Sequence, residues 1–206
     1  MEWADFIPVV LGVLAAVAAV PALLRRVRKG SQGKLDELEQ HLTGIGLKVS
    51  GVEKDTDDDK AIPKNWSEKS DGAFIVADRN VDAIAIRSVS SQYGTNYYLD
   101  YVVRHPGVMA AESKKTTLVR KKSPPLWGKA VDLVWKGSPG LAQRLNYDYQ
   151  LKYALLNSDP AGLKTGITIQ PQPKHGCTRI RTGYHLPSAG LLQAIDTIAK
   201  HVKAGV

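Results

Sequence analysis

The sequence predicts an α+β protein, with a single N-terminal transmembrane helix followed by a soluble domain that has a mainly antiparallel sheet and about four helices. An uncharged stretch at residues 6–24 precedes a segment of ordinary globular composition, since the whole chain is 43% hydrophobic and 23% charged. In that segment strands come first, helices follow, and a β-β-α unit closes the chain. This order lacks the strict alternation of a doubly wound fold.

We divide the chain into four parts by composition. They are an anchor with a basic cytoplasmic flank (1–29), a hinge and amphipathic helix (30–52), an acidic loop (53–71) and an α+β domain (72–206).

The predicted anchor runs from Phe6 to Leu24. As a helix it would be about 28 Å long, close to the hydrocarbon thickness of about 30 Å. Glu2 and Asp5 precede it, and four bases follow it directly: Arg25, Arg26, Arg28 and Lys29. Because basic flanks stay in the cytoplasm, we expect a single-pass signal anchor with the N-terminus outside and the C-terminal domain cytoplasmic. A cleavable signal peptide would carry its bases before the apolar run.

Small residues recur at a spacing of four in the anchor, in the pairs Gly12–Ala16 and Ala15–Ala19. Such spacing lets membrane helices pack closely, so self-association or contact with another subunit's membrane helix is predicted. The alternative is an alanine-rich helix that faces lipid. The bases at 25, 26, 28 and 29 are expected at the anionic inner leaflet, as a lipid-binding cluster or only as a topology determinant.

The first soluble elements are a helix and an acidic loop. Leu35, Leu38 and Leu42 fall at helical spacing, which predicts an amphipathic helix over residues 34–44. The aspartates after it resemble half a calcium loop, but Lys60 and Trp66 stand where that loop needs glycine and glutamate. We therefore expect a solvated loop without a metal, which could dock onto the protein's own basic face or onto a partner.

Four strands are expected next. Residues 73–77 and 81–86 flank a turn and form a hairpin, and strands follow at 97–103 and 116–120. The connections are short, which favours antiparallel neighbours.

The remaining elements are two helices, two strands and a last helix. A short helix is predicted over 126–135, and a longer one over 139–157 with the apolar stripe Leu141, Leu145, Tyr149 and Tyr153. Strands are expected at 164–170 and 177–184. A last helix opens at Pro187-Ser188.

Basic residues carry the strongest functional signal. The formal net charge is +8, and because the first 24 residues contain only Glu2 and Asp5, the rest carries +10. Such an excess attracts anionic lipid, acidic protein or nucleic acid. The candidate anion- or partner-binding residues are Lys114, Lys115, Arg120, Lys121, Lys122, Arg179 and Arg181. The alternative for Lys114–Lys122 is an edge strand protected by lysines. No aromatic residues interleave with these bases, which disfavours nucleic acid.

Catalytic motifs are missing from the sequence. It has no phosphate-binding glycine loop, no H-E-x-x-H and no G-x-S-x-G, so no cofactor or metal is expected. Its one cysteine, Cys177, allows no intrachain disulfide.

Three functional hypotheses remain, in this order. The first is a membrane-anchored, non-catalytic accessory or scaffold subunit of a membrane protein assembly, with a basic cytoplasmic interaction domain. The second is a peripheral module that binds anionic lipid or another anion. The third is an enzyme with an unfamiliar site near His175–His185, where Cys177, Arg179 and Arg181 would have to converge in a pocket.

Overall fold

The computed structural model describes residues 32–52, 56–57, 59, 62–63, 65, 67–105, 114–123, 129–158 and 166–205. The predicted anchor, its packing residues and its basic flank lie outside these ranges. Among the helices that the structure describes, none is long and apolar enough to span a membrane.

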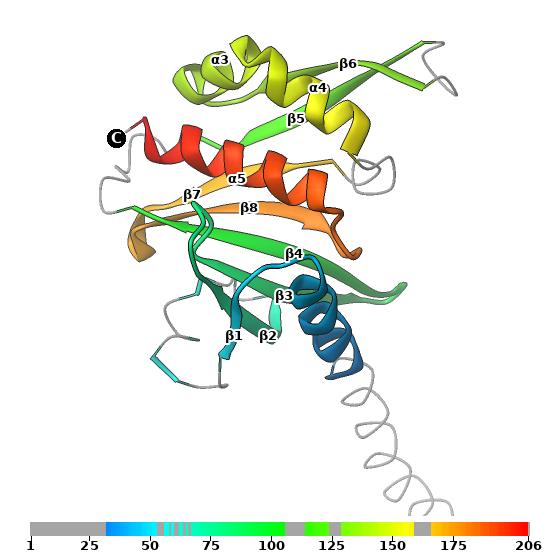
Figure 1. Ribbon diagram of the computed structural model, residues 1–206, viewed down its shortest axis with the longest axis vertical. Helices are drawn as coiled ribbons and strands as arrows, with labels where there is room; N and C mark the ends of the chain where they lie inside the picture. Colours follow the sequence, from blue (N-terminus) through cyan, green and yellow to red (C-terminus); the bar gives the residue numbers. More distant parts are fainter. Residues whose placement is uncertain are drawn as a thin grey trace, which may run out of the picture.

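One antiparallel sheet organises the described residues (Figure 1). Its 8 strands lie in the order β1-β2-β3-β4-β8-β7-β5-β6. Their bounds are β1 (Val49–Val52), β2 (Lys69–Val76), β3 (Ala83–Ser91), β4 (Gly94–Arg104), β5 (Thr116–Ser123), β6 (Lys129–Lys136), β7 (Thr168–Gln172) and β8 (Cys177–Gly183).

The helices cover one face of this sheet. They are a helix over residues 32–44, α3 (Pro139–Tyr147), α4 (Tyr149–Ser158) and α5 (Ala189–Lys203), and a short 3-10 turn, η4 (Pro173–His175), precedes β8. These four helices contribute buried side chains to one apolar cluster that also contains Ile84, Tyr101 and Ile180 of the sheet. The expected α+β class with an antiparallel sheet and about four helices is confirmed for the described part of the chain.

The first helix is an integral part of this core. Leu38 and Leu42 have no exposed surface and join the main cluster, as their spacing predicts. At the other end of the chain, the Ser188 hydroxyl accepts a hydrogen bond of 3.1 Å from the Leu191 N–H. Ser188 therefore caps α5 as the sequence predicts.

The second face of the sheet has a different character. Alternate residues of β3, β4 and β8 point to it, and its apolar part is a small cluster of Ile62, Ala73, Ala83, Ala85, Val102 and Cys177. Ile62 comes from the segment between β1 and β2, so described residues of that segment cover this face. Asp59 is 7% exposed, so this residue of the acidic loop is buried and not solvated.

The helix predicted over 126–135 is wrong. Residues 129–136 form strand β6, paired with β5 from Thr117↔Lys136 to Ser123↔Lys129. Leu133 and Trp135 are buried and their neighbours Asp132 and Val134 are not, which is the two-residue period of a strand. β-branched and aromatic residues suit a half-buried pleated surface, and here β5 supplies the pairing partner.

The single helix predicted over 139–157 is also wrong. The helix is interrupted at Asp148, which separates α3 from α4. The Asp148 carboxylate accepts the Leu151 N–H at 2.8 Å and lies 2.8 Å from His201 Nε2 of α5. Helix α4 therefore begins after Asp148 with a different set of residues facing the core, and its buried residues are Leu151 and Leu155.

Strand number and order depart from the expectation of about six strands with sequential neighbours. The hairpin predicted around residue 79 is confirmed as β2–β3. The short connection between β4 and β5 favoured these two strands as neighbours. In the sheet, however, β8 and β7 lie between them. Strand β1 was not predicted, and β7 begins at Thr168 and continues through Pro171.

Candidate functional site

The most concentrated charge in the described residues is a buried ion-pair cluster on the second face of the sheet. Asp100 of β4 is paired with Arg181 of β8. Arg179 lies two residues before Arg181 in β8 and therefore on the same face of the sheet. Arg87 comes from β3, and Glu68 stands just before β2. We call these five residues the arginine cluster.

Asp100 and Glu68 hold the arginines with short contacts. Arg181 Nε and Nη2 donate to the two Asp100 carboxylate oxygens at 2.6 and 2.8 Å, which is a bidentate pair. Glu68 accepts from Arg181 Nη1 at 2.7 Å and from Arg179 Nη1 at 2.8 Å. Both carboxylates are nearly inaccessible, with side-chain exposures of 0% for Asp100 and 3% for Glu68.

Neighbouring groups complete the cluster. Arg179 Nη2 donates to Gln170 Oε1 at 3.0 Å, and the Arg181 guanidinium lies 4.8 Å from the centre of the Tyr98 ring. The N–H and side-chain amide of Asn65 donate to Glu68 at 3.1 and 2.9 Å. These bonds fix Asn65 to Glu68, whose carboxylate is held by the two arginines.

Electrostatics in the cluster favour the charged forms of Glu68 and Arg181. Burial alone would raise the pKa of Glu68, but hydrogen bonds from Arg181 and the Asn65 backbone, together with the charge of Arg179, lower it to about 2. Burial would lower the pKa of Arg181, and its bonds to Asp100 and Glu68 instead raise it.

The charge of Arg87 is less closely compensated by carboxylates than the charges of Arg179 and Arg181. It is fully buried, its Nε lies 4.0 Å from Asp100 Oδ2, and its Nη2 donates to the carbonyls of Ile62 and Pro63 at 3.3 Å. Burial lowers its pKa, although Asp100 and Asp59 act in the opposite direction. This arginine therefore ties residues 62–63 to the sheet more than it neutralises charge.

The predicted basic residues fall into two groups. Arg179 and Arg181 share a strand face as predicted, and in the structure their partners are carboxylates of the same chain. Lys114, Lys115 and Lys121 are exposed on or next to β5, with Lys121 3.3 Å from Asp132. Arg120 is half-buried, and Lys122 lies in β5 with its side chain outside the described set. Binding of an external anion by these residues stays a prediction.

The residues of the hypothetical enzyme site do not converge. Cys177 is fully buried, and burial raises the pKa of its thiol to about 11, so it is a neutral thiol near pH 7. His175 is exposed on η4, whereas a ring nitrogen of His185 bonds the Gly183 carbonyl at 2.9 Å. Within the described ranges no group of three His, Cys, Asp or Glu side chains could hold a metal ion.

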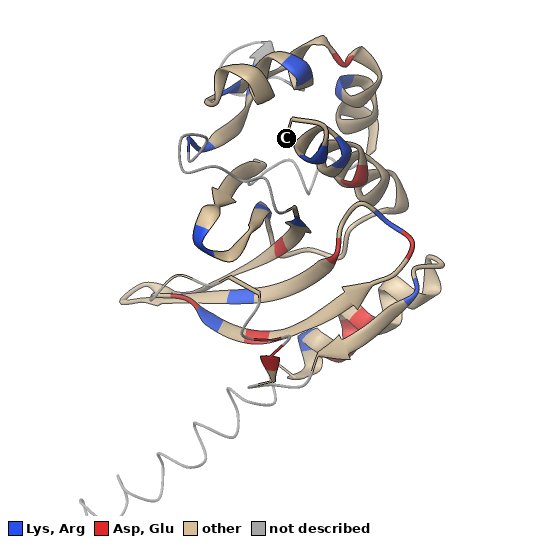
Figure 2. Cartoon of the chain, turned by 90° about the vertical axis from the view of Figure 1, so that its left-hand side faces the viewer, with Lys and Arg blue, Asp and Glu red and all other residues tan. Residues whose placement is uncertain are grey.

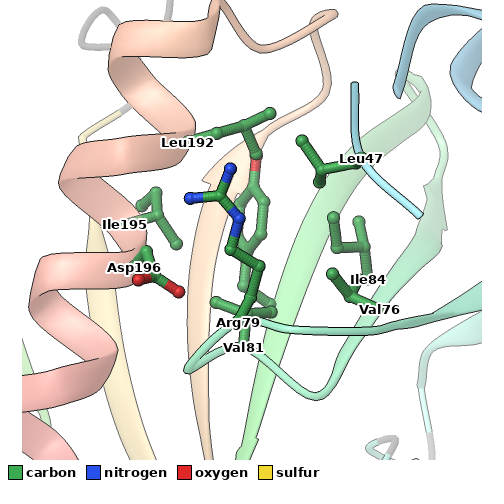
Figure 3. Close-up of a pocket in the computed structure, with 9 residues that line it drawn as sticks. Leu47, Val76, Arg79, Val81, Ile84, Leu192, Ile195 and Asp196 are labelled. Atoms are coloured by element: carbon green, nitrogen blue, oxygen red, sulfur yellow. The ribbon is translucent and has the colours of Figure 1, made fainter. Parts of the chain in front are cut away.

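Two pockets lined by described residues border the helix-covered side of the sheet. One lies between α5 and the β2–β3 hairpin and has a volume of about 20 Å³, which is room for about one water molecule. Figure 3 shows Arg79 extending between Leu192 and Ile195 on one side and Leu47 and Ile84 on the other.

The other pocket, of about 80 Å³, lies between the start of α3 and the end of α5. Its polar wall contains Arg144, whose Nη2 donates to the His201 carbonyl at 3.2 Å, and His105, whose ring nitrogen bonds the Thr178 hydroxyl at 2.9 Å. These polar groups serve contacts within the fold.

Sequence reasoning missed Glu68, Asp100 and Arg87. Asp100 alternates with apolar residues in β4, and Arg87 ends an apolar run in β3, so each is a charge on a strand face that is otherwise apolar. That pattern signals a buried partner. In Figure 2 acidic and basic positions lie side by side on the strands in the middle of the view.

The fold and site define an α+β protein with a single antiparallel sheet, helices on one face and an ion-pair cluster on the other. Comparison with known protein families, with curated proteins and with solved structures found no match for this chain.

Proposed function

We propose that this protein is a membrane-anchored, non-catalytic accessory or scaffold subunit, whose basic domain binds other proteins on the cytoplasmic side. The observation that carries the proposal is the uncharged stretch Phe6–Leu24 followed by the bases at 25–29. An anchor of this kind confines the domain to the membrane surface and raises its effective concentration towards membrane neighbours.

The described residues begin close to the predicted anchor. Gly30 and Ser31 stand between Lys29 and residue 32 in the sequence, and the helix over residues 32–44 is packed into the core through Leu38 and Leu42. Two residues span at most about 7 Å. The domain would therefore stay next to the membrane.

Placement is tested on the full-length protein with a tag after Val206. We expect the protein to stay in the membrane fraction after alkaline extraction, with the tag open to protease only from the cytoplasmic side. Glutamine at Arg25, Arg26, Arg28 and Lys29 should randomise the orientation, because these bases set it. A soluble full-length protein, or a tag outside the cell, would refute the placement.

Partner binding is tested by purification in mild detergent with the anchor intact. Recovery of co-purifying subunits or of a self-associated form is expected, and recovery of only a bare monomer would count against the proposal. Ala16→Leu should weaken the association, since it fills the small-residue face. The matched control is Val17→Leu, which adds one methylene in the next position.

The second candidate function, a module that binds anionic lipid or another anion, is favoured by the exposure of Lys114, Lys115 and Lys121. Residues 30–206 should then bind anionic vesicles with an affinity that falls steeply with salt, because exposed charges are screened. Glutamine at these three lysines should abolish that binding. Equal binding to neutral vesicles would end this hypothesis.

A further inference from the structure

The pocket of about 80 Å³ between the start of α3 and the end of α5 has a lining suited to an anion. It offers several times the space that one water molecule needs. Its polar side chains are those of His105, Ser138, Arg144 and Thr178, and no aspartate or glutamate is among the described residues that line it. Figure 2 looks onto this side of the molecule, where α5 ends. A cavity with an arginine and without a carboxylate favours a ligand of negative charge.

Arg144 supplies the positive charge of this pocket. Its Nη2 donates to the His201 carbonyl at 3.2 Å, which fixes the guanidinium beside the last turn of α5. Its Nη1 has no hydrogen-bond partner among the described residues. Nη1 lies next to the start of α3, since a Cβ added at Gly140 would be 3.6 Å from it. The guanidinium is therefore held in place while the two N–H groups of Nη1 stay available to a ligand.

The start of α3 brings further donors to the same pocket. Ser138 is the N-cap residue, but its side chain makes no cap bond. Gly140 and Leu141 follow in the first turn, where helices leave N–H groups without an intrahelical partner. All three residues line the pocket that Arg144 lines. The guanidinium charge and the positive end of the helix dipole thus act on one cavity.

The arrangement of the donors indicates which anion fits. Arg144 comes from the second turn of α3, Ser138 from its N-cap, and the hydrogen-bonded pair of His105 and Thr178 from the sheet on another wall. Donors on several walls match oxygens that point in several directions. A tetrahedral phosphate has such oxygens, whereas the two oxygens of a carboxylate are coplanar with its carbon. Arginine together with a helix N-terminus is a common phosphate-binding combination.

We propose that this pocket binds a phosphate group, either as the free ion or as the monoester of a small molecule. Arg144 Nη1, the Ser138 hydroxyl and the N–H groups of Gly140 and Leu141 donate to its oxygens. The proposal goes beyond the proposed function and does not depend on the anchor, because every group that it uses lies within the folded domain.

The test titrates inorganic phosphate into the full-length protein in a neutral, phosphate-free detergent, with the ionic strength held constant by sodium chloride. We expect saturable shifts of the Gly140 and Leu141 amide signals in two-dimensional nuclear magnetic resonance spectra, with a dissociation constant on the order of 1 mM. Acetate should bind about tenfold more weakly. Glycerol phosphate distinguishes the two sources: binding at least as tight as that of phosphate assigns the site to a monoester, and weaker binding assigns it to the free ion.

Two substitutions probe the donors. Arg144→Gln should weaken phosphate binding by about tenfold, because it removes a charge-assisted donor. Ser138→Ala should weaken it by about threefold. Since the Ser138 hydroxyl makes no cap bond, this second variant should keep the melting temperature and tests the site even where loss of the Arg144–His201 bond unfolds the first.

The matched control is Lys200→Gln, which removes an exposed positive charge from the last turn of α5 without touching the lining of the pocket. It should change the affinity by less than about twofold, because exposed charges are screened. The proposal is overturned if the Gly140 and Leu141 signals show no saturable shift, or if acetate binds as tightly as phosphate. Unchanged affinity in folded Arg144→Gln or Ser138→Ala protein, or an equal loss in the control, would overturn it as well.

Discussion

Single charged residues fasten the chain across the second face of the sheet. Arg181 forms bidentate bonds with Asp100, and Glu68 bridges Arg179 and Arg181. Removing one partner of such a buried set leaves the other charge without compensation, which costs more than the pair itself contributes. Glu68 and Asp100 are therefore required to compensate the buried charges of Arg179 and Arg181 in the folded protein.

Glu68→Gln is predicted to lower the free energy of unfolding by about 3 kcal/mol at pH 7. The folded-state pKa of about 2 lies below the ordinary value of 4.5, so the contribution is complete above about pH 4.5. It shrinks as the pH falls towards 2, where the folded carboxylate takes up its proton. Urea unfolding of both proteins at pH 7 and pH 3 measures this difference.

The control for this prediction is Glu39→Gln, because Glu39 is exposed on the helix over residues 32–44. It should change the free energy by less than about 0.5 kcal/mol. An equal effect of the two substitutions, or a difference that grows on acidification, would contradict the role of Glu68.

At the scale of single residues, the sequence predicts only two of the five residues of the arginine cluster. Strand alternation places Arg179 and Arg181 on one face. Their partner Glu68 lies 111 and 113 positions away, and no local pattern encodes a contact at that separation. The tertiary fold alone brings Glu68 to these arginines.

Among the elements, β6 is an edge strand whose outer backbone groups form hydrogen bonds with side chains. It pairs only with β5, so its outer backbone groups need other partners. The Asn146 side chain of α3 accepts from the Trp135 N–H and donates to the Trp135 carbonyl, both at 2.9 Å. Asp132 accepts the Leu133 N–H at 2.8 Å. These bonds protect the edge against pairing with another strand.

The turn between β6 and α3 yields a prediction about backbone contact. Gly137 has a φ of +141°, and a Cβ there would lie 2.1 Å from the Lys115 carbonyl oxygen. Gly137→Ala should therefore force β5 and this turn apart and cost several kcal/mol, on the order of 3. Thermal unfolding followed by circular dichroism measures the loss.

Gly176→Ala is the matched control, because Gly176 also has a positive φ, +58°, but open space around its Cβ position. Only the left-handed backbone is strained there, at a cost of about 1 kcal/mol. If both variants lost the same stability, the close approach at Gly137 would be unimportant.

At the scale of the whole molecule, the sheet and the main apolar cluster join the described residues before residue 106 to those after residue 113. The cluster includes Leu42 of the first helix and Leu155 of α4, and the sheet is continuous from β1 to β6. Neither half could bury its apolar face alone. Cooperative unfolding of the described part of the chain follows from this arrangement.

Leu42→Ala and Leu155→Ala are each predicted to lower the stability of that single transition by about 2–5 kcal/mol. Tryptophan fluorescence and far-ultraviolet circular dichroism should give the same midpoint in both variants. Two separated transitions, one shifted by each substitution, would show two independent units instead.

The sequence alone determined the α+β class, the core helices at both ends and the antiparallel β2–β3 hairpin. These depend on periodicity, capping and turn residues, which act over a few positions. Tertiary contact decided the strand β6, the break at Asp148 and the insertion of β8 and β7 between β4 and β5. In each case the deciding partner is remote in the chain: β5 pairs β6, and His201 holds Asp148. Local propensity differences are small, so such long-range contacts override them.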